Sequence, residues 1–451
     1  MSDASNAGLS RFQAIYVLTV LLLAYVLSFI DRTVMAVLIG PIREDFAIDD
    51  FQYSLLHGPA FTFFYVILGL PIARLADRSS RRMVIGVGVF FWSLMTCLCG
   101  FAKSFASLFV MRRGVGVGEA ALSPPTHSLL ADTVSPRRLP VALAVFSLGI
   151  PVGSGLAFVI GGWVYGLFSE FGSLALPGIG ELRPWQLTFI VVGLPGFLIA
   201  LMLLFIKEPP RSDIHQNTAA QTQIPVRDIF SYLWQRRGLY SAPFVSISLL
   251  SILGYGTMTW YLEFMVRSFG VERSVVGPQF GMLFIVAGGL GTLAGGFFVG
   301  WLTRLGYQDA NFRIIVLTAL AWLLPAVAGP LMPTAELALW SVTPTLFLFN
   351  FYFGGAVAGL QLVTPNRMRA QVSAGLLFVV NITGLGLGPV VIGFMTRYLF
   401  GDEAKLNYSL SLVALIVCPL AAWVAGRSLK HYRAMLDSEP AVGGKVQPAV
   451  E

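Results

Sequence analysis

Long apolar segments alternate with short polar or Pro- and Gly-rich loops along almost the whole chain. A helix needs about 20 mostly apolar residues to span a bilayer, and this length rule predicts twelve spanning helices here. Their predicted ranges are 14–39, 51–72, 83–102, 105–130, 138–168, 185–206, 241–266, 275–302, 313–331, 336–363, 370–398 and 408–428. The pattern therefore predicts an all-α membrane protein with twelve transmembrane helices.

One long polar stretch, residues 207–237, separates the sixth predicted helix from the seventh. We expect two six-helix bundles that resemble each other, because the loops after the second and eighth helices place Arg78 and Arg304 at equivalent positions. Such internal repeats are typical of transporters whose substrate site lies near the bilayer midplane. The predicted domains are an N-terminal bundle (1–206), a cytoplasmic linker (207–240), a C-terminal bundle (241–428) and a disordered cytoplasmic tail (429–451).

The composition supports a membrane location. Apolar residues make up 56% of the 451 residues, charged residues only 12%, and mean hydropathy is +0.75, whereas soluble chains are about 25% charged. The net charge of +7 does not indicate nucleic-acid binding, because Lys and Arg lie at the edges of the apolar segments. Of the 30 basic residues, 20 fall on the side of both termini and 7 on the other. This predicts a multi-pass inner-membrane protein with both termini cytoplasmic.

Other function classes lack their required residues. The three cysteines lie in apolar runs without metal-ligand spacing, and no nucleophile or paired-His constellation indicates an enzyme. The glycines of 114–118 follow no strand, so they favour helix packing over phosphate binding. We expect a monomer with no metal, no cofactor other than a coupling proton, and only the bilayer and a small amphipathic or anionic substrate as partners.

Four ionisable residues lie well inside predicted spans: Asp31 and Arg32 in the first, Arg112 and Glu119 in the fourth. A charge at the bilayer centre costs about 2.5–3.5 kcal/mol on insertion scales, so such residues indicate function by default. Helical rise places Asp31 and Arg112 at a common depth, about 7–8 Å from the midplane, where they can pair. Asp31 and Arg32 point about 100° apart, so we expect one to hold a pair and the other to meet a cavity.

Two interpretations of these charges stay open. They either lock the first helix to the fourth or take part in transport. Glu119 lies near the midplane, where burial and a neighbouring arginine act oppositely on the protonation of a carboxylate, so a change of partner can load or release a proton. The C-terminal half shows no equivalent cluster, and its midspan polar residues are neutral, as at Asn350, Gln361 and Asn381. A cavity charged on one wall and apolar on the other suits an amphipathic ligand.

The chain resembles the major facilitator superfamily over its whole length. The loop after the second helix is similar to the superfamily signature, although Ala73 and Ser80 stand where glycines are usual, and Arg112 with Gly116 and Gly118 resembles the signature of the fourth helix. The resemblance implies that the charges of that loop close the cytoplasmic side. These gating residues are Asp77, Arg78, Arg81 and Arg82.

The N-terminal half further resembles the Spinster branch, whose animal members export lysosphingolipid phosphates and lysophospholipids. The resemblance is carried by residues 29–32, 91–93, 112–120, 150–156 and 207–211. It implies that Asp31 and Glu119 couple protons and that Arg32, Arg112 and Glu119 bind substrate. We therefore predict a proton-coupled transporter of a lysolipid or sphingolipid-like substrate, working by alternating access. A transporter of the same fold for a small organic anion or a drug is the alternative.

Overall fold

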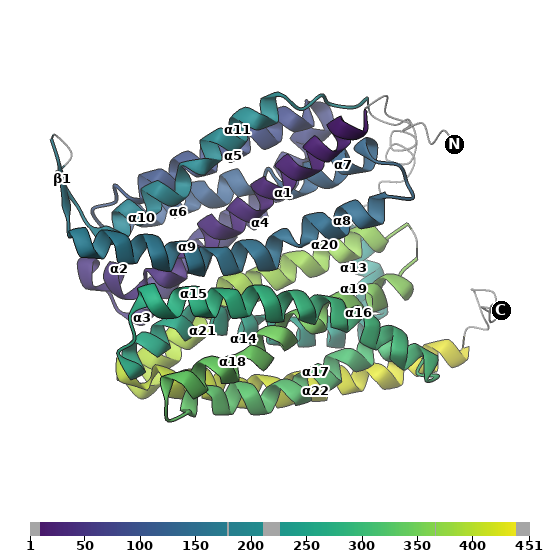
Figure 1. Ribbon diagram of the computed structural model, residues 1–451. Coiled ribbons are helices and arrows are strands. Elements are labelled where there is room, and N and C mark those ends of the chain that lie inside the picture. Colours follow the sequence, from purple (N-terminus) through teal and green to yellow (C-terminus); the bar gives the residue numbers. More distant parts are fainter. Residues whose placement is uncertain (1–9, 178–179, 211–225, 366, 439–451) are drawn as a thin grey trace.

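The computed structural model describes residues 10–177, 180–210, 226–365 and 367–438. Two helical halves lie side by side, and the described chain ends at Ser10 and Ser438 both lie toward the same end of the molecule, on the right of Figure 1. We call this the termini end. A short β hairpin marks the opposite end, which we call the hairpin end.

The N-terminal half is built from helices joined by tight turns and, near its end, by the hairpin. Its elements are α1 (Arg11–Thr33), η1 (Val34–Val37), α2 (Ile39–Phe46), α3 (Asp50–His57), α4 (Pro59–Arg78), α5 (Arg81–Cys99), α6 (Phe105–Glu119), α7 (Ser123–Thr133), α8 (Leu139–Ser147), α9 (Gly149–Phe171), β1 (Leu174–Leu176), β2 (Gly180–Leu182), α10 (Pro184–Gly193) and α11 (Pro195–Leu204). The antiparallel hairpin pairs Leu174 with Leu182 and Leu176 with Gly180, and the apolar pattern did not predict it.

The C-terminal half begins with a short helix outside the bundle. Its elements are α13 (Val226–Gln235), α14 (Arg237–Phe269), α15 (Arg273–Leu283), η2 (Phe284–Gly288), α16 (Gly289–Arg304), α17 (Ala310–Ala328), η3 (Gly329–Leu331), α18 (Ala335–Phe351), α19 (Phe353–Leu362), α20 (Arg369–Val380), η4 (Asn381–Leu387), α21 (Gly388–Phe394), η5 (Met395–Phe400), η6 (Glu403–Lys405) and α22 (Leu406–Ser438). Helices α13 and α14 start inside the predicted linker, and α22 continues to Ser438 in the predicted tail. The rest of both segments, 211–225 and 439–451, lies outside the described residues.

Eleven segments of the described chain are long and apolar enough to cross a membrane. The one predicted span missing from these eleven is the fourth, 105–130, because its helix is broken into α6 and α7. Around the break the backbone closes tighter turns, since Leu122 N donates to Glu119 O and Ala121 N to Gly118 O. Pro124 and Pro125 open α7 without N–H donors, so α-helical bonding cannot run through. The predicted twelve-helix fold is confirmed, with Glu119 as the last residue of α6.

The two halves meet toward the hairpin end, where glycines bring backbones together. A Cβ on Gly155 of α9 would lie 2.5 Å from the carbonyl oxygen of Gly281 of α15, and one on Gly58 would lie 2.3 Å from that of Gly386. His57 and Thr259 also bridge the halves, with 3.1 Å between Nε2 and Oγ1. These contacts pair α9 with α15, and the α3–α4 segment with the η4–α21 segment, across the two halves.

Candidate functional site

A buried ion pair joins the first and fourth spanning helices. Arg32 Nη2 lies 2.6 Å from Glu119 Oε2, and the Ser28 hydroxyl donates to the same oxygen over 2.6 Å. Arg32 is 6% exposed and Glu119 1%. Ser28 and Arg32 lie one helical turn apart on α1, so both face the break at the end of α6. The structure thus brings together two of the four predicted residues, by their side chains.

Three aromatic rings surround the guanidinium of Arg32. Its Cζ lies 4.7 Å from the ring centroid of Phe29, 4.6 Å from that of Phe61 and 5.0 Å from that of Tyr65. Each ring face attracts a cation, and the attraction is stronger where water is excluded. Gly116 lets α6 approach α4 at this point, because a Cβ there would lie 2.4 Å from the carbonyl oxygen of Phe61. The cage was not predicted, since aromatic residues in an apolar span carry no distinguishing signal.

The second pair of predicted residues is arranged differently. Arg112 Nη1 donates over 3.2 Å to the main-chain oxygen of Asp31, and not to its carboxylate. Within the described chain the Asp31 carboxylate accepts no hydrogen bond, although it lies beside Trp92, Thr96 and the guanidinium of Arg112. Asp31 and Arg112 are both fully buried. Their predicted common depth is confirmed, whereas the direct side-chain pair is formed by Arg32 with Glu119 instead.

One aromatic residue of the C-terminal half comes near this cluster. Tyr255 of α14 lies within electrostatic range of Arg32, and its ring contacts Phe349 of α18 at a centroid distance of 5.3 Å. Asn350 and Asn381 donate to carbonyl oxygens one turn earlier in their own helices, those of Leu346 and Leu377. The named midspan polar groups of the C-terminal half are thus neutral and bonded within their own helices, and the contrast between two cavity walls stays a prediction.

The predicted gating residues lie at the termini end. Arg81 pairs with Asp132 of α7 and with Glu208, whose Oε1 is 3.1 Å from Nε. Arg82 Nη1 donates to the carbonyl oxygens of Leu204 and Ile206, at 3.2 Å and 2.7 Å. These contacts stay within the N-terminal half and the chain just after it. Asp77 and Arg78 are exposed at the end of α4, and the gating role of all four residues stays a prediction.

Glu208, which lies outside the membrane spans, has a pKa that its surroundings change. Burial alone raises the pKa of its carboxyl group, but hydrogen bonds from the Ser80 hydroxyl and from the backbone and side chain of Arg81 lower it further than burial raises it. The pKa of Glu208 therefore lies below its usual value. The carboxylate holds the chain leaving α11 against the start of α5.

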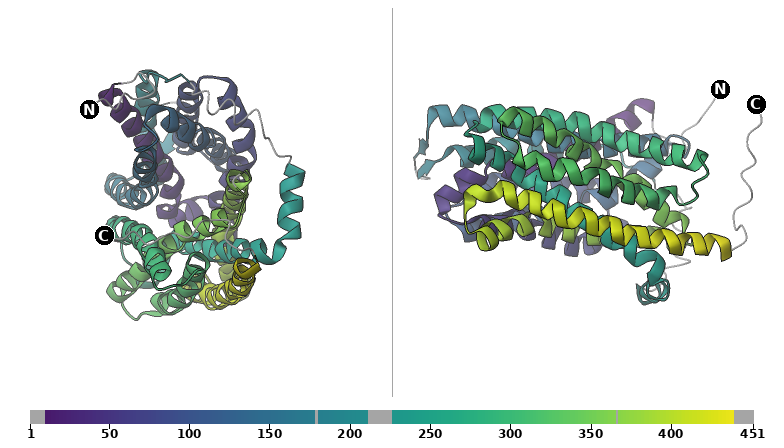
Figure 2. Two further views of the ribbon diagram at one scale, coloured as in Figure 1. Left: turned by 90° about the vertical axis from the view of Figure 1, so that its right-hand side faces the viewer. Right: turned by 90° about the horizontal axis from the view of Figure 1, so that it is seen from below.

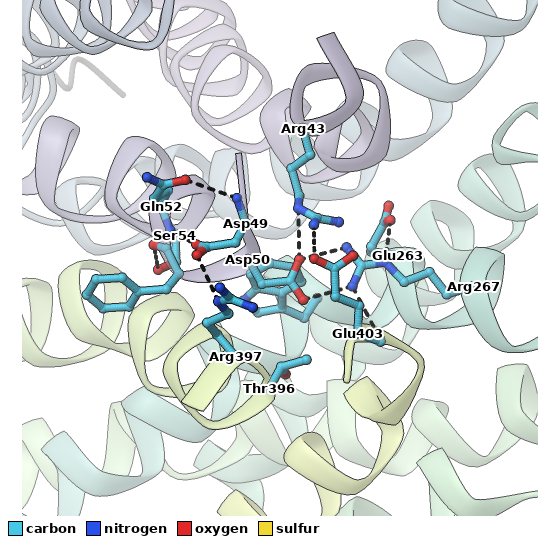
Figure 3. Close-up of polar contacts among 12 residues, drawn as sticks. Arg43, Asp49, Asp50, Gln52, Ser54, Glu263, Arg267, Thr396, Arg397 and Glu403 are labelled. Atoms are coloured by element: carbon cyan, nitrogen blue, oxygen red, sulfur yellow. Dashed lines mark hydrogen bonds and ion pairs between the residues drawn. The ribbon is translucent and has the colours of Figure 1, made fainter. Parts of the chain in front are cut away.

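A larger ion-pair network joins the two halves at the hairpin end (Figure 3). Asp50 at the start of α3 accepts two hydrogen bonds of 2.8 Å from Arg267 at the end of α14. Two further pairs cross between the halves, Arg43 with Glu403 and Asp49 with Arg397. Among the described residues, every ion pair between the halves belongs to this network, which we call the hairpin-end network.

Glu263 organises the C-terminal side of the hairpin-end network. Its two oxygens accept from Arg267 Nε and Arg273 Nη1, each over 2.8 Å, and it is 2% exposed. The C-terminal half was expected to have no equivalent of the midspan cluster, and its charge cluster indeed lies at the helix ends instead. The sequence does hold a sign of this cluster, because Glu263 lies within the predicted span 241–266. Its position near the end of that span, however, is also typical of a charged residue in a solvated loop.

Comparison with known proteins agrees with this architecture. Residues 21–393 match the sequence model of the Major Facilitator Superfamily. An "MFS-type efflux pump" of Mycolicibacterium smegmatis is 26% identical over 428 residues, 93% of each chain. "Sphingosine-1-phosphate transporter SPNS2" of Danio rerio is 25% identical over 433 residues, 89% of this chain and 80% of that protein.

Among solved structures, a bacterial homolog of the human lysosomal transporter Spinster, in an inward-facing and unoccupied conformation, is similar with a TM-score of 0.80. Its sequence is 26% identical, and the match covers 96% of this chain and all of the other. The resemblance to Spinster inferred from the N-terminal motifs is thus also found in the fold. With a family match over most of its length and a fold shared with a bacterial Spinster homolog, this multi-pass membrane protein belongs to the Major Facilitator Superfamily of transporters.

Proposed function

We propose that this chain is a proton-coupled secondary transporter that moves an amphipathic, lysolipid or sphingolipid-like substrate by alternating access. The observation that carries the proposal is the buried pair of Arg32 with Glu119 inside an aromatic cage. An intramembrane ion pair is costly, and it belongs where a transport site is expected in a fold of two repeats. The named function of the Danio rerio relative, sphingosine-1-phosphate transport, supports the substrate class.

The distribution of basic residues supports an inner-membrane protein with both termini in the cytoplasm. In that orientation the hairpin end is extracellular. The ion pairs between the halves gather there, which supports an inward-facing arrangement. Asp77, Arg78, Arg81 and Arg82 would then act in the opposite state, by closing the cytoplasmic side. The transporter works as a monomer and needs no cofactor beyond the proton and no nucleic acid.

Protonation of Glu119 is the proposed coupling step. A proton on this carboxyl group removes the charge that holds Arg32 at 2.6 Å, and the guanidinium becomes available to a phosphate or carboxylate head group. The aromatic wall at Tyr255 and Phe349 offers apolar contacts to the tail of the same molecule. Proton and substrate drive the cycle only if each binds the two states with different affinity.

The total charge of the cluster favours this coupling. Asp31 and Glu119 carry two negative charges and Arg32 and Arg112 two positive ones, so the unprotonated cluster is neutral in sum. One added proton leaves a single positive charge buried in a medium of low dielectric constant, where it is costly without a counter-ion. An anionic substrate supplies that counter-ion. Asp31 is the second proton-accepting group, since it lies within electrostatic range of both Glu119 and Arg112.

A small organic anion or a drug is the second candidate substrate. A guanidinium binds any carboxylate or phosphate by the same bidentate geometry, and the Mycolicibacterium smegmatis relative is named an efflux pump. The two candidates differ in their need for an apolar tail. Substitution of Phe349 by Ala should weaken binding of a lysolipid while leaving a short-chain anion unaffected.

Flux into liposomes under an imposed pH gradient tests the proposal. We expect the wild-type protein to transport a fluorescent lysolipid faster with a pH gradient than without one. Glu119→Gln and Asp31→Asn should lose the stimulation by the gradient, whereas Glu170→Gln, at an exposed carboxylate of α9, should retain it. If both buried-carboxylate variants keep gradient-driven flux, the coupling is wrong; if only a short-chain anion is moved, the lipid substrate is wrong.

A further inference from the structure

Helix α13 differs from every spanning helix in its direction. In the left view of Figure 2 the spanning helices are seen nearly end-on, while the short teal helix α13 is seen from its side. In the right view the relation is reversed, and α13 protrudes beside the bundle near the termini end. One residue, Arg236, separates α13 from α14, which is long and apolar enough to cross a membrane. Helix α13 therefore lies across the bundle, at the start of a candidate membrane span.

The side chains of α13 divide into three faces around its axis. Ile229, Tyr232 and Leu233 pack against the protein, with Ile229 only 7% exposed. Phe230 and Trp234, one turn apart, point outward and are 71% and 67% exposed. The remaining face carries exposed polar residues. These are Asp228, Ser231 and Gln235.

An aromatic face of this kind in water would be unfavourable, because burying a large apolar side chain contributes about 1.5–3 kcal/mol. A helix lying in the bilayer interface resolves this, since one face meets protein, one lipid and one water. Tryptophan is also the residue type most typical of the interface. The three faces of α13 match that environment.

Arginines flank the aromatic face at both ends. Arg227 lies one turn before Phe230, while Arg236 and Arg237 follow the helix, and all three are exposed. The guanidinium of Arg237 lies 5.4 Å from the ring centroid of Trp234, and that of Arg236 lies 5.2 Å from Tyr232. Basic residues beside interfacial aromatic rings favour anionic lipid head groups. Asp228, on the polar face, is the one acidic residue of the helix.

The neighbouring helix α22 gives an independent measure of the membrane level. The ring of His431 lies against Gly238, where an added Cβ would be 3.0 Å from it, so both residues are at one depth. Two turns deeper into the bundle is Trp423, 56% exposed, with the Arg427 guanidinium 3.8 Å from its ring centroid. In this second exposed Trp–Arg pair, the Arg427 side chain lies between the level of Trp423 and the level of His431. The pair therefore indicates a membrane surface between the level of Trp423 and the start of α14.

We propose that α13 is a membrane-docking helix, with Phe230 and Trp234 inserted at the acyl boundary of the leaflet on the termini side and Arg227, Arg236 and Arg237 bound to the phosphates of anionic phospholipids. The one-residue junction transmits this docking to α14, whose far end carries Glu263 and Arg267 of the hairpin-end network. The C-terminal half is thereby held at a set depth in the bilayer. The inference is independent of the transported substrate.

Spin labels test the docking in the full chain. Cysteines are placed singly at 228, 230, 231, 234 and 235 in a background with Cys97, Cys99 and Cys418 replaced by alanine, and the protein is reconstituted in nanodiscs containing phosphatidylglycerol. We expect labels at 230 and 234 to be accessible to oxygen and shielded from an aqueous nickel chelate, and labels at 228, 231 and 235 to show the opposite. Equal nickel access at all five positions, or spin–spin broadening at 230 and 234 from a second copy, would overturn the proposal.

The preference for anionic lipids is tested by the thermal stability of the full chain, with its aromatic residues unchanged. Phosphatidylglycerol added to the detergent-purified protein should raise its apparent melting temperature more than phosphatidylcholine does. Removing one arginine should raise the lipid concentration that gives half of the full stabilisation by about fivefold. The variants are Arg227→Gln, Arg236→Gln and Arg237→Gln. Arg433→Gln, which removes a charge at the same end but from a pair with Asp309, serves as the control and should leave the lipid preference unchanged. Equal responses to both lipids, or equal losses in control and test variants, would contradict anionic-lipid docking.

Discussion

Asp50 and Arg267 come from opposite halves of the protein and share two hydrogen bonds of 2.8 Å each. Each also has a partner in its own half, because Arg43 Nε lies 3.0 Å from Asp50 and Arg267 Nε lies 2.8 Å from Glu263. When the halves separate, neither charge is left without an opposite charge. The hairpin-end network thus avoids the largest penalty of opening a buried ion pair, which is an uncompensated charge.

Asp50→Asn should shift the conformational equilibrium toward separation at the hairpin end. Charge-assisted hydrogen bonds contribute about 1.5–3 kcal/mol, so the population ratio should change by roughly tenfold or more. Spin labels at exposed positions on each half, Ser169 of α9 and Glu336 of α18, report the change as a longer distance by double electron–electron resonance. Arg433→Gln breaks a pair at the termini end within one half and should leave that distance unchanged.

Arg32 and Glu119 should show strong coupling in a double-mutant cycle. Glu119→Gln leaves Arg32 buried without a counter-ion, and breaking a buried pair in this way costs about 3–5 kcal/mol. Asp31→Asn should cost less, because the Asp31 carboxylate accepts no hydrogen bond from the described residues. Combining Glu119→Gln with Arg32→Gln should recover part of the loss. Apparent melting temperatures in detergent measure these changes, and additive effects of the two substitutions would contradict a direct pair.

The helix positions were predictable because bilayer thickness sets the length of each apolar segment, whatever the rest of the fold does. The pairing inside them was not. Asp31 and Arg32 differ by about 100° around one helix, and which of them meets the fourth helix depends on how α1 and α6 pack. The break after Glu119 had a visible cause in Pro124 and Pro125. It was missed because the length rule treats an apolar segment as one helix.

The hairpin-end network was missed for a different reason. Arg43, Arg267 and Arg397 contribute only to the count of basic residues on the outer side, and a count contains no distances. Partners such as Asp50 and Arg267 are 217 positions apart in the sequence. Only the packing of the two halves brings them together. From the sequence, a charged residue at a helix end can therefore be either a solvated loop residue or a partner in an ion pair between the halves.

Gly281→Ala should weaken the contact between α9 and α15. The added Cβ would lie 2.3 Å from the carbonyl oxygen of Gly155, and a backbone atom cannot move aside as a flexible side chain does. Overpacking of this kind costs about 1–3 kcal/mol. Gly296→Ala, in the continuation of the same helix, is the matched control, since nothing lies within 4 Å of its added Cβ. The Ser169–Glu336 label distance should lengthen in the first variant alone; equal distances in both would show that the contact does not hold the halves together.

Glu208 should stabilise the protein at neutral pH and lose its effect in acid. Hydrogen bonds from Ser80 and Arg81 keep the pKa of this carboxyl group below its usual value despite partial burial. A carboxylate with a depressed pKa in the folded state contributes stability above its unfolded pKa of about 4.3, and that contribution is lost as pH falls through the folded value.

The variant Glu208→Gln should therefore melt below the wild type by a constant interval from about pH 8 to pH 6, and the interval should shrink once the pH falls below about 4.3. Glu170→Gln makes the same substitution at an exposed position and should show no such interval. The curves are measured on detergent-purified protein by intrinsic fluorescence. An interval that grows on acidification would mean that the folded state raises the pKa of Glu208. That result would contradict a stabilising contact of the Glu208 carboxylate with Arg81.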